Sequence, residues 1–126
     1  MIPCREQCVW AVGNIAGDST VLRDLVIDKG IADSIEAILS QASLAVDGDA
    51  GKISTTLLRN AVWCASNIFR GKPKPSFDKL ESLLKSMIAL VNIKDMEVGI
   101  CETCMICIRS CPCDIFVLLF SCSGED

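Results

Sequence analysis

Two pairs of tryptophan and asparagine residues have the types and the spacing that could bind an extended peptide. Trp10 is followed four residues later by Asn14 and Trp63 by Asn67, and the sequence holds only these two tryptophans. An asparagine amide can donate to a peptide carbonyl and accept from a peptide N–H. An indole ring packs against aliphatic side-chain stems and attracts ammonium and guanidinium groups through its π-face. The two pairs therefore predict a binding surface for a lysine-rich segment.

An amide side chain stands three residues before each tryptophan, and this extends the two pairs into two matching rows. Gln7 precedes Trp10 and Asn60 precedes Trp63, with the second row 53 residues after the first. Residues i, i+3 and i+7 share one face of an α-helix, so each row would present its amides and its indole together. The alternative is that both tryptophans belong to the core and both asparagines end helices. The repetition, the preceding amides and the net charge of −4 favour a surface for a basic peptide.

A run of cysteines near the C-terminus would support a different chemistry. The sequence holds nine cysteines, and four of them match the full C-x2-C-x2-C-x3-C-P spacing of bacterial ferredoxins, namely Cys101, Cys104, Cys107 and Cys111. Three thiolates on a tight loop, with a fourth from a distant cysteine, could hold a 4Fe–4S cluster for electron transfer. A second such run is lacking and the surrounding pattern is helical, so we favour an interpretation without any cofactor. A zinc site ranks lower still, because paired C-x2-C knuckles are missing.

Composition excludes several classes of protein. The sequence has no histidine, so Ser-His-Asp or Cys-His catalysis and HExxH zinc chemistry are ruled out, and we expect no enzyme. With 12 basic and 16 acidic residues, the chain has no basic surface for nucleic acid. Its longest apolar run, at residues 115–120, is far shorter than the roughly 20 residues that cross a bilayer. The charged N-terminus is unlike a secretory signal, so we expect a protein of the cytoplasm and nucleus with reduced thiols.

Helices must position these residues, because apolar side chains recur at spacings of three and four along most of the chain. Strand-like alternation is scarce and 51% of the residues are hydrophobic, so we expect an all-α fold. Three glycines, Gly17, Gly30 and Gly71, are predicted to end helices. The predicted helices span residues 5–16, 20–27, 31–42, 54–70, 80–91 and 96–109.

Two longer segments surround the rows: REQCVWAVGNIAGDS at residues 5–19 and LLRNAVWCASNIFRGK at residues 57–72. Both closely resemble consecutive armadillo repeats of importin α, and the likeness extends over about residues 5–98. It implies a non-enzymatic adaptor that binds the nuclear localisation signals of cargo proteins and passes them to importin β.

The same likeness implies how the chain is organised. Residues 1–98 would form about two to two and a half armadillo repeats of an α-solenoid. The inner helices, which line the concave face of such a solenoid, would lie at about residues 5–16 and 54–70. Residues 99–126 would be a divergent, cysteine-rich tail.

The likeness also implies a role for each residue of the two rows. Trp10 and Trp63 would line slots for the lysines of the signal, and Asn14 and Asn67 would bind the peptide backbone. The amides that precede the tryptophans would add flanking hydrogen bonds. Asp18 would receive the ammonium group of the most deeply held lysine, and the alternative role for Asp18 is that of an ordinary helix N-cap.

The sequence departs from the family pattern at several points. The next inner helix should carry a tryptophan near Cys104 and an aromatic residue or asparagine four residues later, where this chain has Ile108. The basic importin β-binding segment of the family is absent, as are the repeats on either side. We therefore expect a partial groove in a truncated product, with importin β as a partner only for a full-length relative.

Overall fold

The computed structural model describes residues 4–44, 53–94 and 96–111, and within these ranges the chain is helical with no strand. The helices are α1 (Cys4–Asp18), α2 (Thr20–Asp28), α3 (Ile31–Leu44), α4 (Thr55–Phe69), α5 (Phe77–Val91) and α6 (Val98–Arg109). The predicted all-α class is confirmed. No helix in the described part of the chain is long and apolar enough to cross a membrane.

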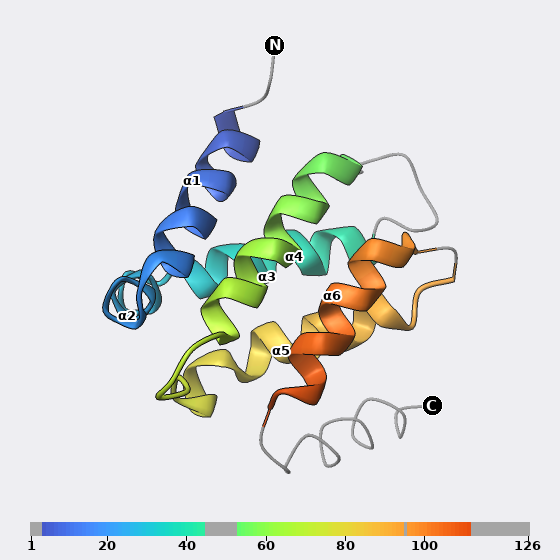
Figure 1. Cartoon of the computed structure of the whole chain (residues 1–126). Helices are drawn as coiled ribbons and strands as arrows, with labels where there is room; N and C mark the ends of the chain where they lie inside the picture. The colour runs from blue at the N-terminus through green and yellow to red at the C-terminus, as the bar shows by residue number, and fades with distance from the viewer. Residues whose placement is uncertain (1–3, 45–52, 95, 112–126) are drawn as a thin grey trace.

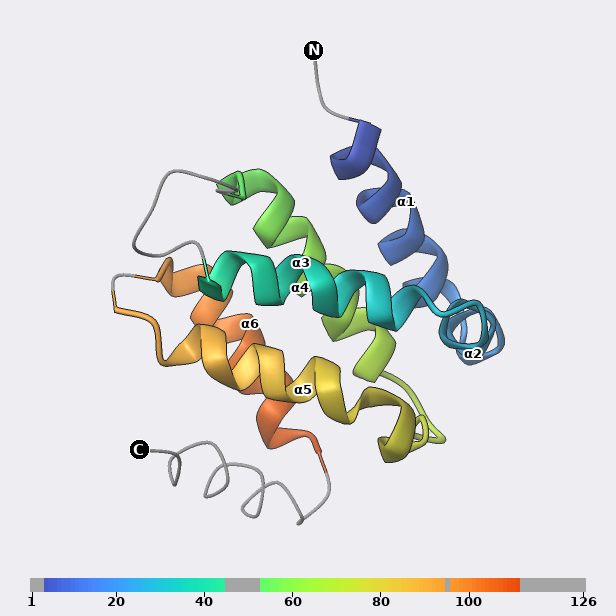
Figure 2. The same ribbon diagram turned by 180° about the vertical axis from the view of Figure 1, so that it is seen from behind.

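The helices form two layers. In Figure 1, α1, α4 and α6 run in roughly the same direction, with α1 packed along α4 and α4 packed along α6. Seen from behind in Figure 2, α3 and α5 lie side by side and cover α4 and α6. The short helix α2 crosses at the end of α1. This all-helical layering is the arrangement expected of an armadillo α-solenoid fragment. The assignment of residues 5–16 and 54–70 to inner helices stays a prediction.

The predicted end of the first helix is wrong by two residues. Gly17 was expected to cap this helix, but α1 continues through Gly17 to Asp18. A Cβ atom at Gly17 would lie 2.8 Å from Nδ2 of Asn67, so the glycine provides room for a neighbouring helix. Gly30 and Gly71 adopt positive φ angles of 78° and 92°, which confirms that these two glycines follow helix ends.

One hydrophobic core joins both layers. Leu39 of α3, Ala61 of α4, Leu84 of α5 and Cys104 of α6 are each completely buried in it. Helix α6 thus packs into the same core as the preceding helices, although the boundary to a divergent tail was predicted at residue 98. Residues 112–126 of that tail lie outside the described residues.

Hydrogen bonds between side chains tie the helices of each layer together. Ser54, the N-cap of α4, donates at 2.6 Å to the buried carboxylate of Glu6 at the start of α1. In the other layer, Ser40 of α3 and Ser86 of α5 both donate to Oε1 of Glu36, at 2.6 and 2.9 Å. The buried carboxylate of Glu6 and the half-buried one of Glu36 therefore each accept from a hydroxyl of another element, which offsets the cost of their desolvation.

Candidate peptide-binding surface

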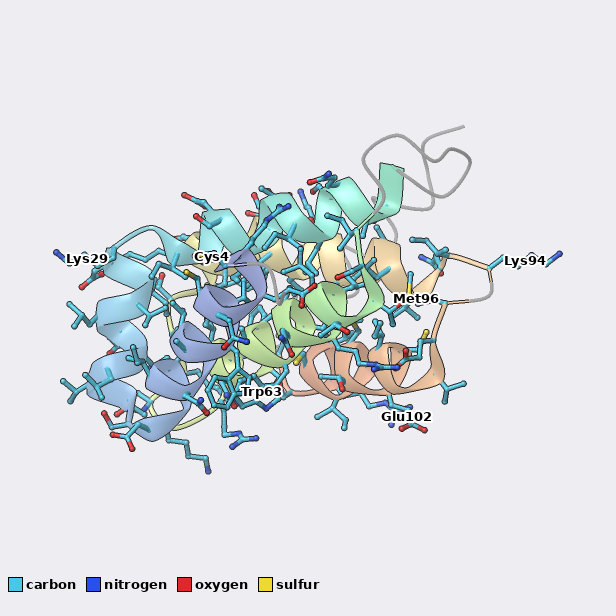
Figure 3. The ribbon with its side chains drawn as sticks, turned by 90° about the horizontal axis from the view of Figure 1, so that it is seen from above. Cys4, Lys29, Trp63, Lys94, Met96 and Glu102 are labelled. Carbon is cyan, nitrogen blue, oxygen red and sulfur yellow. The ribbon has the colours of Figure 1, made fainter. Side chains whose placement is uncertain are left out.

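The predicted binding residues lie on two adjacent helices of the first layer. We use the term open face for the side of α1, α4 and α6 that points away from α3 and α5. Figure 3 looks along the layers and shows Trp63 where α1 meets α4, on this open face. The side chain of Trp10 is 52% exposed, and that of Trp63 is half-buried. The structure thus places both indoles on neighbouring, roughly parallel helices.

The ring of Trp63 packs directly against the backbone of α1 at Gly13. A Cβ atom added to Gly13 would lie only 2.5 Å from Cζ3 and 2.8 Å from Cε3 of this ring. Real side chains do not tolerate such distances, so the contact requires glycine at this position. The position of the second indole is therefore set by the close approach of α1 and α4.

The two asparagines differ in their surroundings. Asn14 is exposed, whereas Asn67 is 4% exposed and donates from Nδ2 to the main-chain oxygen of Gly13 at 2.9 Å. This bond satisfies a buried amide and ties α4 to α1. An asparagine amide has a second N–H and an acceptor oxygen, so the bond to Gly13 leaves hydrogen-bonding capacity for a ligand.

The other predicted residues also lie on α1 and α4. Gln7 and Asp18 of α1 are exposed, and Asn60 of α4 is half-buried. The N-cap of α2 is Ser19, whose hydroxyl accepts from the backbone N–H of Leu22 at 3.1 Å. The interpretation of Asp18 as an ordinary N-cap is therefore wrong, and its carboxylate remains available at the end of α1.

A groove between α4 and α6 adjoins these residues, and no pattern in the sequence had predicted it. Its volume is about 340 Å³, and Trp63 and Ser66 of α4, with Arg70 directly after this helix, line one wall. Thr103 and Ile106 of α6 line the opposite wall. Lys74, in the segment after α4, also lines the groove. The basic sequence RGKPK at residues 70–74 was the signal that could have pointed to it.

A buried arginine fixes the chain where α4 ends. Arg23 of α2 is 1% exposed, and its Nη1 donates to the main-chain oxygen of Arg70 at 2.8 Å. Its Nε and Nη2 donate to Oδ1 of Asp24 at 3.0 and 2.8 Å. The guanidinium therefore satisfies a carbonyl at the C-terminus of α4 and holds the backbone of Arg70 beside the groove.

The cysteine run does not form the loop that an iron–sulfur cluster would need. Cys101, Cys104 and Cys107 lie within α6, and Cys111 follows it by two residues. Burial raises the pKa of Cys104 to about 12 and that of Cys107 to about 11, so both remain protonated thiols near neutral pH. Among the described residues, no three Cys, Asp or Glu side chains are grouped so that they could hold a metal ion.

Comparison with known proteins gives related sequences, although no protein-family model matches the chain. Importin subunit alpha-2 of Arabidopsis thaliana is 44% identical over 94 residues, and importin subunit alpha-1b of Oryza sativa subsp. japonica is 42% identical over 94 residues. The probable importin subunit alpha-A of Dictyostelium discoideum is 32% identical over 100 residues. These alignments cover 73 to 75% of this chain but only 16 to 17% of each relative. The chain thus spans about one-sixth of the length of the curated relatives it matches.

Proposed function

We propose that this chain, which belongs to the importin α family of armadillo-repeat proteins, binds lysine-rich nuclear localisation signals on the open face of α1 and α4. The observation that carries the proposal is the pairing of two Trp and Asn rows on packed helices, with the indole of Trp10 open to solvent and that of Trp63 partly so. The chain would act as a binding adaptor without catalysis.

The contacts of the open face suit an extended basic peptide. Lysine stems would pack between and against the indoles of Trp10 and Trp63, and each cation over an indole face contributes about 0.5 to 2 kcal/mol. Asn14 would bind the peptide backbone with both functions of its amide, and Asn67 with the functions that Gly13 leaves free. The carboxylate of Asp18 at the end of α1 would pair with one ammonium group.

Binding by two rows is expected to be weak. A peptide loses conformational freedom when it lies along the two helices, and few contacts offset that loss. The two amides in front of the tryptophans, Gln7 and Asn60, would add flanking hydrogen bonds. In the cell, the partners would be cargo proteins that pass between cytoplasm and nucleus, with importin β as a further partner of a full-length relative.

The test is a titration of a lysine-rich signal peptide, followed by calorimetry at low salt. Trp10→Ala and Asn14→Ala remove exposed side chains, so they should weaken binding about tenfold each while the melting temperature stays unchanged. Leu25→Ala is the matched control, because it removes a 49% exposed apolar side chain from α2. Equal affinities for all four proteins would refute the proposal.

A further inference from the structure

We propose that the groove between α4 and α6 binds an acidic residue of the same peptide, so that the open face selects a basic cluster with a carboxylate on one flank. This inference rests on the proposed function and specifies its substrate. Trp63 belongs both to the peptide surface and to the groove wall. A peptide that runs from α1 across the indole of Trp63 would therefore continue into the groove.

The charges that line the groove have one sign. Among the described residues, Arg70 and Lys74 are the two charged ones that line the groove, and both are cations. Nζ of Lys74 donates to the main-chain oxygen of Phe69 at 3.2 Å, which anchors the ammonium at the C-terminus of α4. Arg23 fixes the backbone of Arg70 in the same region. Two cations beside an open volume favour a carboxylate and repel a lysine.

Arg70 and Lys74 lie close enough to a buried thiol of the groove to influence its ionisation. The positive charges of Lys74 and Arg70 lower the pKa of Cys107 and partly offset the larger increase that burial causes. Cys107 lines the groove from α6, opposite the segment that carries both cations.

The carboxylates that the structure describes near the groove do not line it. Glu97 at the start of α6 accepts two hydrogen bonds from Arg59, at 2.7 and 2.6 Å, and this guanidinium holds the pKa of Glu97 below its usual value. Glu102 projects from α6 in Figure 3 and does not line the groove. Asp18, which would receive a lysine, lies on α1 beyond the other tryptophan row. The charge of the surface therefore changes from acidic at α1 to basic at the groove.

Helix α6 also lacks the side chains for another lysine slot. Cys104 and Ile108, at the positions where the family pattern has a tryptophan and an aromatic residue or asparagine, are buried in the core. The groove wall instead presents Thr103 and Ile106, and Ile106 is 66% exposed. In a peptide with an acidic residue followed by an apolar one, the carboxylate would thus pair with a cation of the groove and the apolar side chain would contact Ile106.

The experiment compares three peptides that share one lysine-rich core. The first has neutral flanks, the second carries a pair of glutamates on its N-terminal flank, and the third carries the same pair on its C-terminal flank. The two glutamate peptides have equal net charge, so a difference between them reports position only. We expect one glutamate peptide to bind about threefold to tenfold more tightly than the neutral peptide, and the other to bind more weakly beside Asp18.

A pair of substitutions locates the effect. Arg70→Gln with Lys74→Gln should abolish the preference between the two glutamate peptides. The control is Lys85→Gln with Lys94→Gln, which removes the same charge from exposed positions outside the groove. Figure 3 shows Lys94 at the edge of the molecule, far from Trp63. A preference that survives the groove substitutions, or that both double variants lose equally, would overturn the inference.

The outcomes also separate this inference from the proposed function. If all three peptides bind equally and Trp10→Ala weakens each of them, the groove inference alone fails. If the neutral peptide does not bind, or if Trp10→Ala leaves its affinity unchanged, the proposed function fails and the inference fails with it.

Discussion

Asn67 of α4 donates a buried hydrogen bond to the main-chain oxygen of Gly13 of α1 at 2.9 Å, while the neighbouring ring of Trp63 covers the same glycine. The Trp and Asn row of α4 is thus fixed to the backbone of α1, which carries the other row. The separation of the two indoles follows from this packing, and a change at the contact should alter stability and peptide binding together.

Replacing Gly13 with alanine tests this contact. Its new Cβ would stand 2.5 Å from Cζ3 of Trp63, so the ring or the helix must move. Overpacking of this kind costs about 1 to 3 kcal/mol, which should outweigh the roughly 1 kcal/mol that alanine gains over glycine in a helix. We expect a lower free energy of unfolding in urea and weaker peptide binding.

The control for this prediction is Gly99→Ala in α6. A Cβ there would meet only Oε1 of Glu97 at 3.4 Å, an ordinary contact, so this variant should be as stable as the wild type or more stable. Equal stabilisation by the two glycine substitutions would show that α1 and α4 are not closely packed at Gly13.

Arg23 should be essential for stability, because its buried guanidinium joins α2 to the end of α4. Arg23→Met removes the donor to the carbonyl of Arg70 and leaves Asp24 without its partner. We expect a loss of about 2 to 4 kcal/mol in chemical unfolding. Asp24→Asn is the matched variant, and its effect should stay below about 1 kcal/mol, since the side chain of Asp24 is 56% exposed. A loss at Asp24 as large as that at Arg23 would contradict this assignment.

Buried thiols should make the protein less stable at high pH. Burial raises the pKa of Cys64 and of Cys104 from the ordinary value of 9.0 to about 12. When folding raises the pKa of a group, its contribution to the free energy of unfolding is fully present below the pKa of the unfolded state. That contribution is lost as the pH rises through the pKa of the folded state. We therefore expect the free energy of unfolding, measured under reducing conditions, to fall between about pH 9 and pH 12.

Alanine substitutions identify the source of that pH dependence. Cys64→Ala and Cys104→Ala should lower stability at neutral pH through the small cavities they create, yet each should flatten the decline at alkaline pH. An unchanged slope in both variants would assign the alkaline loss to other groups.

Anaerobic reconstitution with iron and sulfide should yield a colourless protein. Two members of the ferredoxin-type spacing, Cys104 and Cys107, belong to the core side of α6, and binding a cluster would require this helix to unfold. Iron analysis and visible absorption provide the measurement, with Cys101→Ser and Cys111→Ser as variants at half-buried positions. A brown protein with about four irons per chain, lost in those variants, would restore the electron-transfer hypothesis.

Local patterns in the sequence predict much of the fold, because helices depend mainly on nearby residues. The spacing of apolar side chains indicated each helix to within a few residues, and Gly30 and Gly71 marked ends that require positive φ. The repeated Trp and Asn rows also indicated which helices should lie side by side. The peptide-binding roles of these residues stay a prediction.

Contacts between distant parts of the chain were decided only by the tertiary structure. Gly17 resembled a helix cap in the sequence, but it lies inside α1, where the absence of a Cβ leaves room for Asn67. Cys104 and Cys107 matched a cluster motif by spacing, yet the core formed by α4 and α5 buries them. The groove lined by Arg70 and Lys74 likewise arises where α4 and α6 pack. The spacing of residues in the sequence shows which side chains share a face of one helix. Whether that face is buried depends on the neighbouring helices that pack against it, which the spacing does not determine.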